Sequence, residues 1–226
     1  MKLLIISDPH GTNHWEKIKK LDLNKIDKII FLGDYFDSFT IGFNRQMSNA
    51  KQIIKFKLAN REKVCLCWGN HCTSYYLDER CSGWQHMHTF DIEEFFRINK
   101  ILFEVAFIFD KWIFTHAGVS KEWMKCSGIK KPTEINDLFK SRPNFFRHVG
   151  PDPFGQNPNE GPLWIRPQTL QDYALRGWNQ CVGHTAVVPA PAEYISINDD
   201  KLLIVDAPTY DCFVELDTET DKWKVI

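Results

Sequence analysis

The chain has 226 residues, of which 43% are hydrophobic and 25% are charged, a composition typical of a globular protein with one well-buried core. Its 28 basic and 29 acidic residues give a net charge of −1, so no overall field attracts it to nucleic acid or to an anionic membrane. No stretch approaches the ~18 apolar residues of a membrane span, and the first residues lack the pattern of a secretion signal. We therefore expect a cytoplasmic protein folded as one domain over residues 1–226.

The first third of the chain alternates predicted strands with predicted helices. Apolar runs of strand length cover Leu3–Ile6, Lys28–Leu32 and Val64–Trp68, and each ends in a turn that contains Gly or Asp. Apolar residues recur with helical spacing in His14–Leu23 and Gln46–Leu58. Continuous apolar strands are typical of a mostly parallel sheet covered on both faces. The pattern predicts a β-α-β-α-β opening with right-handed crossovers.

The remainder mixes helices, a hairpin and a long loop. Phe90–Ile101 and Gln168–Leu175 are predicted helices, and Phe103–Phe109 with Lys111–Thr115 form a predicted hairpin. The stretch Ser141–Pro162 is rich in Pro, Gly and Asn and is predicted to be a loop. Four short strands are predicted in the tail: Tyr194–Ile197, Leu202–Val205, Cys212–Leu216 and Lys222–Ile226. We expect this tail to be an antiparallel finish with a second sheet packed on the first.

Five short polar clusters occur along the chain, most of them where an apolar run ends. They are DPH (Asp8–His10), GDYFD (Gly33–Asp37), GNH (Gly69–His71), HAG (His116–Gly118) and GHT (Gly183–Thr185). Loops at the carboxyl ends of strands aim short side chains at one point, so these clusters can meet there. Their carboxylates, amide oxygen and imidazoles are the ligand mix that two adjacent divalent metals need.

The chemistry follows from the residue types. Asp34 can bridge two ions with its two oxygens, and Asn70 adds a hard oxygen ligand without further negative charge. Two metals ~3.5–4 Å apart can hold a bridging hydroxide and the oxygens of a phosphate, as in-line displacement at phosphorus requires. His71 can protonate the leaving oxygen, and Asp37 can accept the proton on the other ring nitrogen. No nucleophilic side chain is required.

The order D-x-H, G-D-x-x-D, G-N-H, H-x-G and G-H resembles the calcineurin-like metallophosphoesterases. Within them the chain looks most like the phosphoprotein phosphatase branch with its small bacterial and phage members. GDYFD resembles that branch's GDYVD, HAGVS resembles its HGGLS, and PLWIRP (Pro162–Pro167) resembles the LLW-I-R segment of the bacterial members. The resemblance spans the chain from Leu3 to about Leu216.

The resemblance implies an α/β fold of two packed mixed β-sheets flanked by helices, the four-layer αββα metallophosphoesterase sandwich, with the site at its edge. It implies two divalent metal ions, with manganese expected and iron, zinc or nickel as alternatives. The implied first metal site is Asp8, His10 and Asp34, and the second is Asp34, Asn70, His116 and His184. The implied general acid is His71, paired with Asp37, and the implied phosphate-binding residues are Arg166 and Asn70.

The chain departs from the branch at two places. Ser38–Phe39 follow GDYFD, where the branch has Arg-Gly, and Cys72–Ser74 follow GNH, where the branch has Glu and a nearby arginine. The missing arginine grips the substrate phosphate in the branch, so these departures concern the specificity for phosphoproteins and leave the implied metal site intact. Arg45, Arg142 and Arg147 are candidate replacements, and Arg147 in the long loop is preferred.

Three further expectations concern residues near the motifs. The seven cysteines are expected to be reduced, buried thiols, with a reactive Cys72 as the less favoured alternative. Trp164, beside Arg166, is a candidate to line the substrate cleft. His148 is the one histidine outside the clusters that we retain as a site candidate.

The expected function is hydrolysis of phosphomonoesters, on phosphoserine and phosphothreonine or on small phosphates. A phosphorylated protein or a small phosphorylated molecule is thus the expected partner, with no membrane and no nucleic acid. The alternatives are symmetrical dinucleoside tetraphosphate hydrolysis and, third, phosphodiester or nucleic-acid cleavage, against which the single histidine of GHT and the near-neutral charge weigh. A metal-free binding relic of the fold is the alternative that is not an enzyme. Such relics usually lose a ligand or the acid, and here all six ligands and His71 are present.

Overall fold

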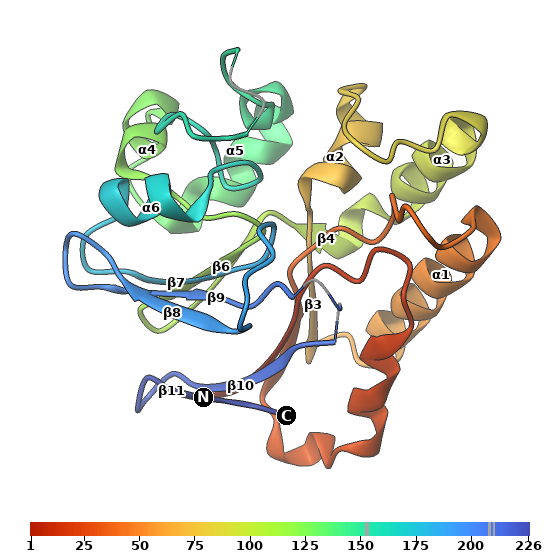
Figure 1. Ribbon diagram of the computed structural model, residues 1–226, viewed down its shortest axis with the longest axis horizontal. Coiled ribbons are helices and arrows are strands. Elements are labelled where there is room, and N and C mark those ends of the chain that lie inside the picture. Colours follow the sequence, from red (N-terminus) through yellow and green to blue (C-terminus); the bar gives the residue numbers. More distant parts are fainter. Residues whose placement is uncertain (152–153, 208, 210) are drawn as a thin grey trace.

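Two mixed β-sheets pack against each other at the centre of the fold, and helices flank them (Figure 1). The computed structural model describes residues 1–151, 154–207, 209 and 211–226. Helices α1, α2 and α3 lie beside the first sheet, and α4, α5 and α6 lie on the side of the second sheet (Figure 1). The predicted α/β fold of two mixed sheets flanked by helices is confirmed.

The first sheet has the strand order β11-β10-β1-β2-β3-β4. Its strands are β1 (Lys2–Ile6), β2 (Lys28–Phe31), β3 (Val64–Cys67), β4 (Phe103–Glu104), β10 (Phe213–Asp217) and β11 (Lys222–Val225). Strands β1 to β4 are parallel, and β10 and β11 are antiparallel to their neighbours. Helix α1 (Phe43–Ala59) connects β2 to β3 as predicted. The predicted helix His14–Leu23 is instead two 3-10 helices, His14–Lys20 and Leu23–Lys25, because Leu21 between them has extended backbone.

The second sheet has the strand order β5-β6-β7-β9-β8. Its strands are β5 (Ala106–Phe109), β6 (Trp112–Thr115), β7 (Asn179–Val182), β8 (Ala192–Ile195) and β9 (Lys201–Ile204). The predicted strand Phe103–Phe109 is divided at Val105 between the two sheets, where Asn136 Oδ1 accepts hydrogen bonds from the backbone N–H groups of Val105 (2.9 Å) and Ala106 (3.0 Å). The predicted antiparallel tail is wrong in part, because β9 pairs in parallel with β7, while β10 and β11 return to the first sheet.

The described part of the chain has five further helices. They are α2 (Asn70–Leu77), α3 (Thr89–Asn99), α4 (Lys121–Ser127), α5 (Ile135–Ser141) and α6 (Pro167–Tyr173), with 3-10 turns at His86–His88, Lys100–Leu102, Pro132–Glu134 and Pro143–Phe146. Helices α2, α4 and α5 were not predicted from the sequence. The predicted loop Ser141–Pro162 is therefore not all loop, since Ser141 ends α5 and a 3-10 turn follows; positions 152–153 of it lie outside the described residues.

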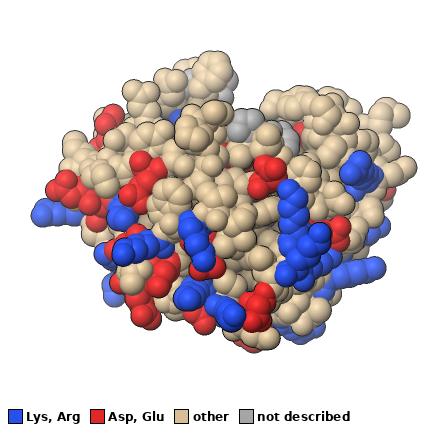
Figure 2. Space-filling view, turned by 60° about the horizontal axis from the view of Figure 1, so that its bottom comes forward, with Lys and Arg blue, Asp and Glu red and all other residues tan. Residues whose placement is uncertain are grey.

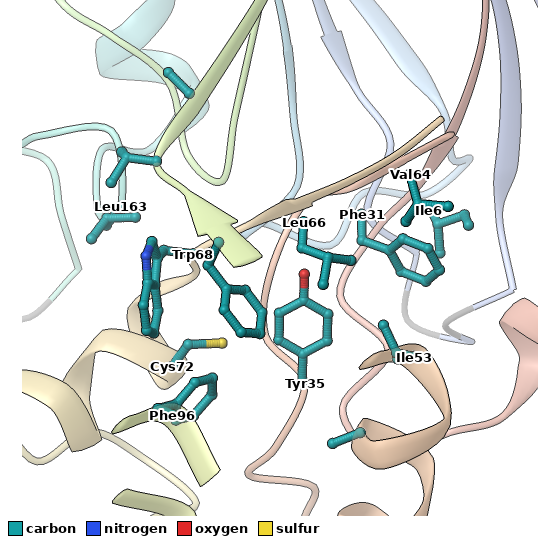
Figure 3. Packing of buried hydrophobic residues seen from close by; sticks show 14 of the residues in the cluster. Ile6, Phe31, Tyr35, Ile53, Val64, Leu66, Trp68, Cys72, Phe96 and Leu163 are labelled. Atoms are coloured by element: carbon teal, nitrogen blue, oxygen red, sulfur yellow. The ribbon is translucent and has the colours of Figure 1, made fainter. Parts of the chain in front are cut away.

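Successive side chains of each strand point to opposite faces of the sheet, and this divides the core into layers. On β1, Leu4 and Ile6 face the helices of the first sheet, in the cluster drawn in Figure 3, whereas Leu3 and Ile5 face the second sheet. Trp112 of β6 is fully buried in the same inter-sheet cluster. Since side chains buried on both faces hold the strands in register, the loops at their carboxyl ends start from rigid positions. No helix in the described part of the chain combines the length and the apolar character needed to cross a membrane.

Candidate metal centre and active-site cleft

The six predicted metal ligands lie together at one edge of the two sheets. Each follows the carboxyl end of a strand: Asp8 and His10 follow β1, Asp34 follows β2, Asn70 follows β3, His116 follows β6 and His184 follows β7. The contacts join both sheets, because the backbone N–H of His184 donates to Asp8 Oδ2 at 2.6 Å and His116 Nε2 lies 3.3 Å from Asp34 Oδ2. His10 Nε2 lies 3.8 Å from the same Asp34 oxygen. Residues distant in the sequence thus form one cluster.

A backbone carbonyl fixes the orientation of each candidate imidazole ligand. The three hydrogen bonds are from His10 Nδ1 to Phe36 (2.6 Å), from His116 Nδ1 to Leu32 (2.9 Å) and from His184 Nε2 to Trp164 (3.1 Å). A carbonyl oxygen only accepts, so each of these nitrogens carries the proton and the other ring nitrogen faces the cluster. Histidines that bind metals in proteins are held in this way.

The inward nitrogens lie against atoms that also carry lone pairs. His116 Nε2 is 2.7 Å from Asn70 Oδ1, and His184 Nδ1 is 3.1 Å from both of these atoms. Such atoms repel one another unless a proton or a cation lies between them. Separations of ~3 Å match two ligands bonded at ~2.1 Å to one ion at about a right angle. The donor set of oxygens and imidazoles therefore fits divalent cations.

The electrostatics of the cluster also favour cations. Burial lowers the pKa of His116, but the charges of Asp34 and Asp8 outweigh it and raise that pKa to about 10. Burial and the neighbouring Asp8 raise the pKa of Asp206 to about 9. Asp8 Oδ1 is buried and accepts no hydrogen bond from the residues that the structure describes. In the absence of metal, protons on His116 and Asp206 thus balance part of the buried negative charge.

The backbone is left-handed at several site residues, which brings the motif loops close together. The positive φ angles are 39° at His10, 52° at Asp34, 67° at Asp37 and 64° at His184. Such angles are costly for residues other than glycine and concentrate at functional sites. A Cβ at Gly69 would lie 2.1 Å from Asp34 Oδ1, and one at Gly183 would lie 2.8 Å from Asp8 Oδ1. The glycines of GNH and GHT are therefore needed for the close approach of the loops.

The predicted acid and its partner are also brought together. His71 Nδ1 lies 3.0 Å from Asp37 Oδ2, and Tyr75 Oη donates to Asp37 Oδ1 at 2.5 Å. Burial lowers the pKa of His71, but the charge of Asp34 and the hydrogen bond to Asp37 outweigh it, so this pKa lies well above its ordinary value. Cations bound by Asp34 would cancel most of its charge, which leaves Asp37 as the group that favours the imidazolium.

A cleft of about 430 Å³ opens over this cluster. Trp164, His148 and Arg166 line it, as does Arg80, which the sequence analysis did not single out. Arg166 Nη1 donates to Thr185 Oγ1 at 2.9 Å. It also donates to the carbonyl of His184 at 3.2 Å, while Nε donates to the carbonyl of Phe154 at 2.7 Å. The guanidinium is thus held beside the candidate metal ligands.

The structure does not bring the preferred replacement arginine into the cleft. Arg147 donates to the backbone carbonyl of Leu77 and is not among the lining residues, and Arg142 donates to the carbonyl of Ser127 at 2.8 Å. Arg80 is exposed and lines the cleft from the loop after α2.

Three further residues beside the site were missed by the sequence analysis. Tyr75 holds Asp37, Asp206 adjoins Asp8, and Cys81 Sγ lies 3.2 Å from His71 Nδ1. None of them belongs to a motif, and only the spacing of His71 and Tyr75, four apart on one helix, carried a signal. The expected buried thiols are confirmed for five of the seven cysteines, including Cys72, whose pKa burial raises; Cys81 and Cys126 are the more accessible ones.

Comparison with known proteins places this geometry in a family. The family description "calcineurin-like phosphoesterase" matches residues 1–188. The cold-active protein-tyrosine phosphatase of the psychrophile Shewanella sp. is 17% identical with a TM-score of 0.61, and the match covers 99% of this chain and 80% of that one. A mutant of a cold-active protein tyrosine phosphatase has a TM-score of 0.64 at 17% identity, with the same coverage. A metallophosphoesterase from Sphaerobacter thermophilus has a TM-score of 0.49 at 11% identity, and the match covers 100% of this chain and 88% of that one. No curated protein matches the chain significantly.

Proposed function

The chain belongs to the calcineurin-like phosphoesterases, which are metal-dependent hydrolases, and on that premise we propose that it is a phosphomonoesterase that works with two divalent metal ions, manganese foremost. One observation carries the two-metal proposal: three imidazoles, each anchored through one nitrogen to a backbone carbonyl, direct the other nitrogen at the carboxylates and amide oxygen of one buried cluster. Asp8, His10 and Asp34 would hold one ion. Asp34, Asn70, His116 and His184 would hold the other.

Bound metals supply Lewis acidity and positive charge for the in-line attack of water on phosphorus. The protein's own part begins with the substrate phosphate. Arg166 presents a guanidinium held by Thr185, and a guanidinium neutralises the equatorial oxygens of a phosphoryl group as their charge grows. Asn70 is the second candidate for contact with the phosphate.

The leaving oxygen receives its proton from His71. Asp37 accepts the hydrogen bond from Nδ1, so Nε2–H is the donor toward the cleft. Tyr75 holds the second Asp37 oxygen, which keeps the carboxylate from rotating away. Because His71 donates this proton, the enzyme can release poor leaving groups such as the alkoxides of serine and threonine.

Other residues of the cleft also bear on substrate binding. Arg80 on the rim is our candidate for the arginine that does not follow GDYFD. The backbone N–H of His148 donates to Glu79 Oε1 at 3.2 Å, and Arg147 donates to the carbonyl of Leu77. These two hydrogen bonds connect the segment that contains His148 to the end of α2 on the other side of the cleft. On the face that Figure 2 shows, which is turned away from the cleft, basic and acidic side chains are interspersed.

A substrate panel under saturating manganese tests the proposal. It contains phosphoserine, phosphothreonine and phosphotyrosine peptides, a nucleotide monophosphate, diadenosine tetraphosphate and bis-para-nitrophenyl phosphate. Phosphotyrosine is included because the similar Shewanella protein is named a protein-tyrosine phosphatase. We expect the best monoester to exceed the diester in kcat/KM by about 100-fold or more. A faster tetraphosphate or diester would overturn the monoester proposal, and no turnover by the fully metallated protein would favour a binding relic.

A further inference from the structure

The pair formed by Asp37 and His71 has a third neighbour with a different chemistry. Cys81 Sγ lies 3.2 Å from His71 Nδ1 and 3.7 Å from Asp37 Oδ2. One carboxylate, one imidazole and one thiol thus direct their ligand atoms at a common point, and we refer to them as the thiol cluster. None of the three is among the predicted ligands of the dimetal site.

The spacing in the thiol cluster is close to that of a zinc site. Zinc bonds of ~2.0–2.1 Å to nitrogen and oxygen and ~2.3 Å to sulfur, at tetrahedral angles, separate the ligand atoms by about 3.3–3.6 Å. The observed separations are 3.0 Å for N to O, 3.2 Å for S to N and 3.7 Å for S to O. Shifts of a few tenths of an ångström would therefore accommodate the ion.

Charge and ligand softness favour zinc over manganese here. A thiolate and a carboxylate bring two negative charges, which balance one divalent cation. Thiolate is a soft ligand that selects zinc, whereas manganese prefers oxygen ligands such as those of the dimetal site. The thiol cluster is also reachable, because Cys81 lines the active-site cleft and the neighbouring shallow pocket beside Ser38 and Trp84. A water molecule from either side can take the fourth position.

We propose that Asp37, His71 and Cys81 form a third metal site, selective for zinc, whose occupancy switches the enzyme off. Binding replaces the proton on Cys81 and the proton on His71 Nδ1, both of which pass to solvent. With Nδ1 bound to zinc, transfer of the Nε2 proton to a leaving oxygen would leave an imidazolate, so His71 becomes a much weaker acid. The proposed inhibition by zinc rests on the proposed role of His71 as the acid, but the proposed binding of zinc does not.

Cobalt substitution tests binding without reference to activity. With the dimetal site first saturated with manganese, Co²⁺ bound to a thiolate gives a sulfur-to-cobalt absorption band in the near ultraviolet, which oxygen and imidazole ligands do not give. We expect the band in the wild type and in Cys126→Ser, a control at an exposed thiol on α4, and we expect zinc to abolish it. Cys81→Ser should lack it, and Cys81→Ala repeats the test with a second side chain. A wild type without the band, or variants at Cys81 that keep it, would overturn the site.

Zinc titration of turnover tests the switch. Each protein is normalised to its own rate without zinc, under saturating manganese. We expect the half-inhibitory zinc concentration to rise by about tenfold or more in Cys81→Ser and to stay unchanged in Cys126→Ser, because even losing an indirect partner costs a metal site that much affinity. Equal sensitivity in all three proteins would place inhibition at the dimetal site and refute the switch. Absence of turnover would refute the proposed function, and the cobalt band would still decide whether the site exists.

Discussion

The substitution His71→Asn separates proton donation from metal binding. It removes the imidazole but keeps the backbone N–H of residue 71, which donates to Asp34 Oδ1 at 3.0 Å. The candidate metal ligands keep their positions and partners, so the metal content should stay at the wild-type level. Asp37 keeps its hydrogen bond from Tyr75.

The size of the effect depends on the leaving group. A positioned general acid contributes about 10²–10⁴-fold, which is about 2.7–5.4 kcal/mol of activation free energy at 1.36 kcal/mol per tenfold. We expect this loss for an alkyl phosphate, because an alkoxide must be protonated as it departs. Nitrophenolate is stable as an anion, so for para-nitrophenyl phosphate the loss should stay below about tenfold.

The assay compares kcat for an alkyl phosphate and for para-nitrophenyl phosphate under saturating manganese. His86→Asn, at an exposed histidine of the 3-10 turn before α3, is the matched control and should stay within about twofold of the wild type. Equal losses for both leaving groups would refute the assignment of His71 as the acid. A fall in metal content would instead identify His71 as part of the metal centre.

Gly183→Ala should abolish metal loading, since its Cβ would lie 2.8 Å from Asp8 Oδ1; full loading by elemental analysis would contradict this. Arg166→Lys should lower kcat/KM for phosphomonoesters by about 10–100-fold, because an ammonium cannot reproduce the guanidinium fork, and unchanged kinetics would remove Arg166 from the phosphate site. The pKa of His116, about 10 without metal, means that metal must displace its proton, so manganese affinity should rise by about tenfold per pH unit from about pH 6 to 8. Calorimetry in buffers of different ionisation enthalpy measures the released proton, and affinity independent of pH would count against His116 as a ligand. Manganese at 100 times its Kd should stabilise the fold by about 2.7 kcal/mol per site, and a Tm unchanged by chelation would show that the site is not coupled to folding.

The motif residues could be predicted because their chemistry and their place on strands are both visible in the sequence. A continuous apolar run such as Leu3–Ile6 identifies a buried strand, and Asp8 follows it after one intervening residue, Ser7. The carboxyl ends of the parallel strands of one sheet lie at one edge, so the convergence of Asp8, Asp34 and Asn70 follows from the topology of the first sheet. The structure places the backbone N–H of His184 on Asp8 Oδ2, across 176 positions of the chain.

Helix α2 and strand β7 could not be predicted, because tertiary contacts rather than local patterns stabilise them. The α2 sequence NHCTSYYL has no apolar periodicity, and the helix is held by buried Cys72 and by Tyr75 stacked on Trp84. Strand β7 begins with two polar residues, Asn179 and Gln180, so it lacks the continuous apolar run of a buried strand. In the fold, Gln180 exchanges two hydrogen bonds with the backbone of Val119, which satisfies its buried amide.

Arg80 and Cys81 approach the site because the chain reverses its direction after α2, and the sequence does not reveal this turn. Asp78 ends α2 in the left-handed conformation, with φ of 52°, and turns the chain back over the acid pair. Gly83 then passes so close that a Cβ would lie 2.7 Å from the carbonyl oxygen of Asp37. Propensity does not predict that a residue other than glycine adopts the left-handed conformation at a given position. The motifs therefore could not reveal that Arg80 and Cys81 line the cleft.

Asp206 explains how the fold can hold this cluster before any metal binds. Asp8 and Asp34 are buried side by side, and a third carboxylate beside Asp8 would be costly if it were charged. With its pKa raised to about 9, Asp206 is neutral at pH 7, while His116 with a pKa of about 10 carries a positive charge. Protons thus occupy the place of cations in the metal-free protein. Because a metal bound by His116 replaces the proton on that ring, the cluster can form with the fold, and pH and metal concentration together then decide whether it is loaded.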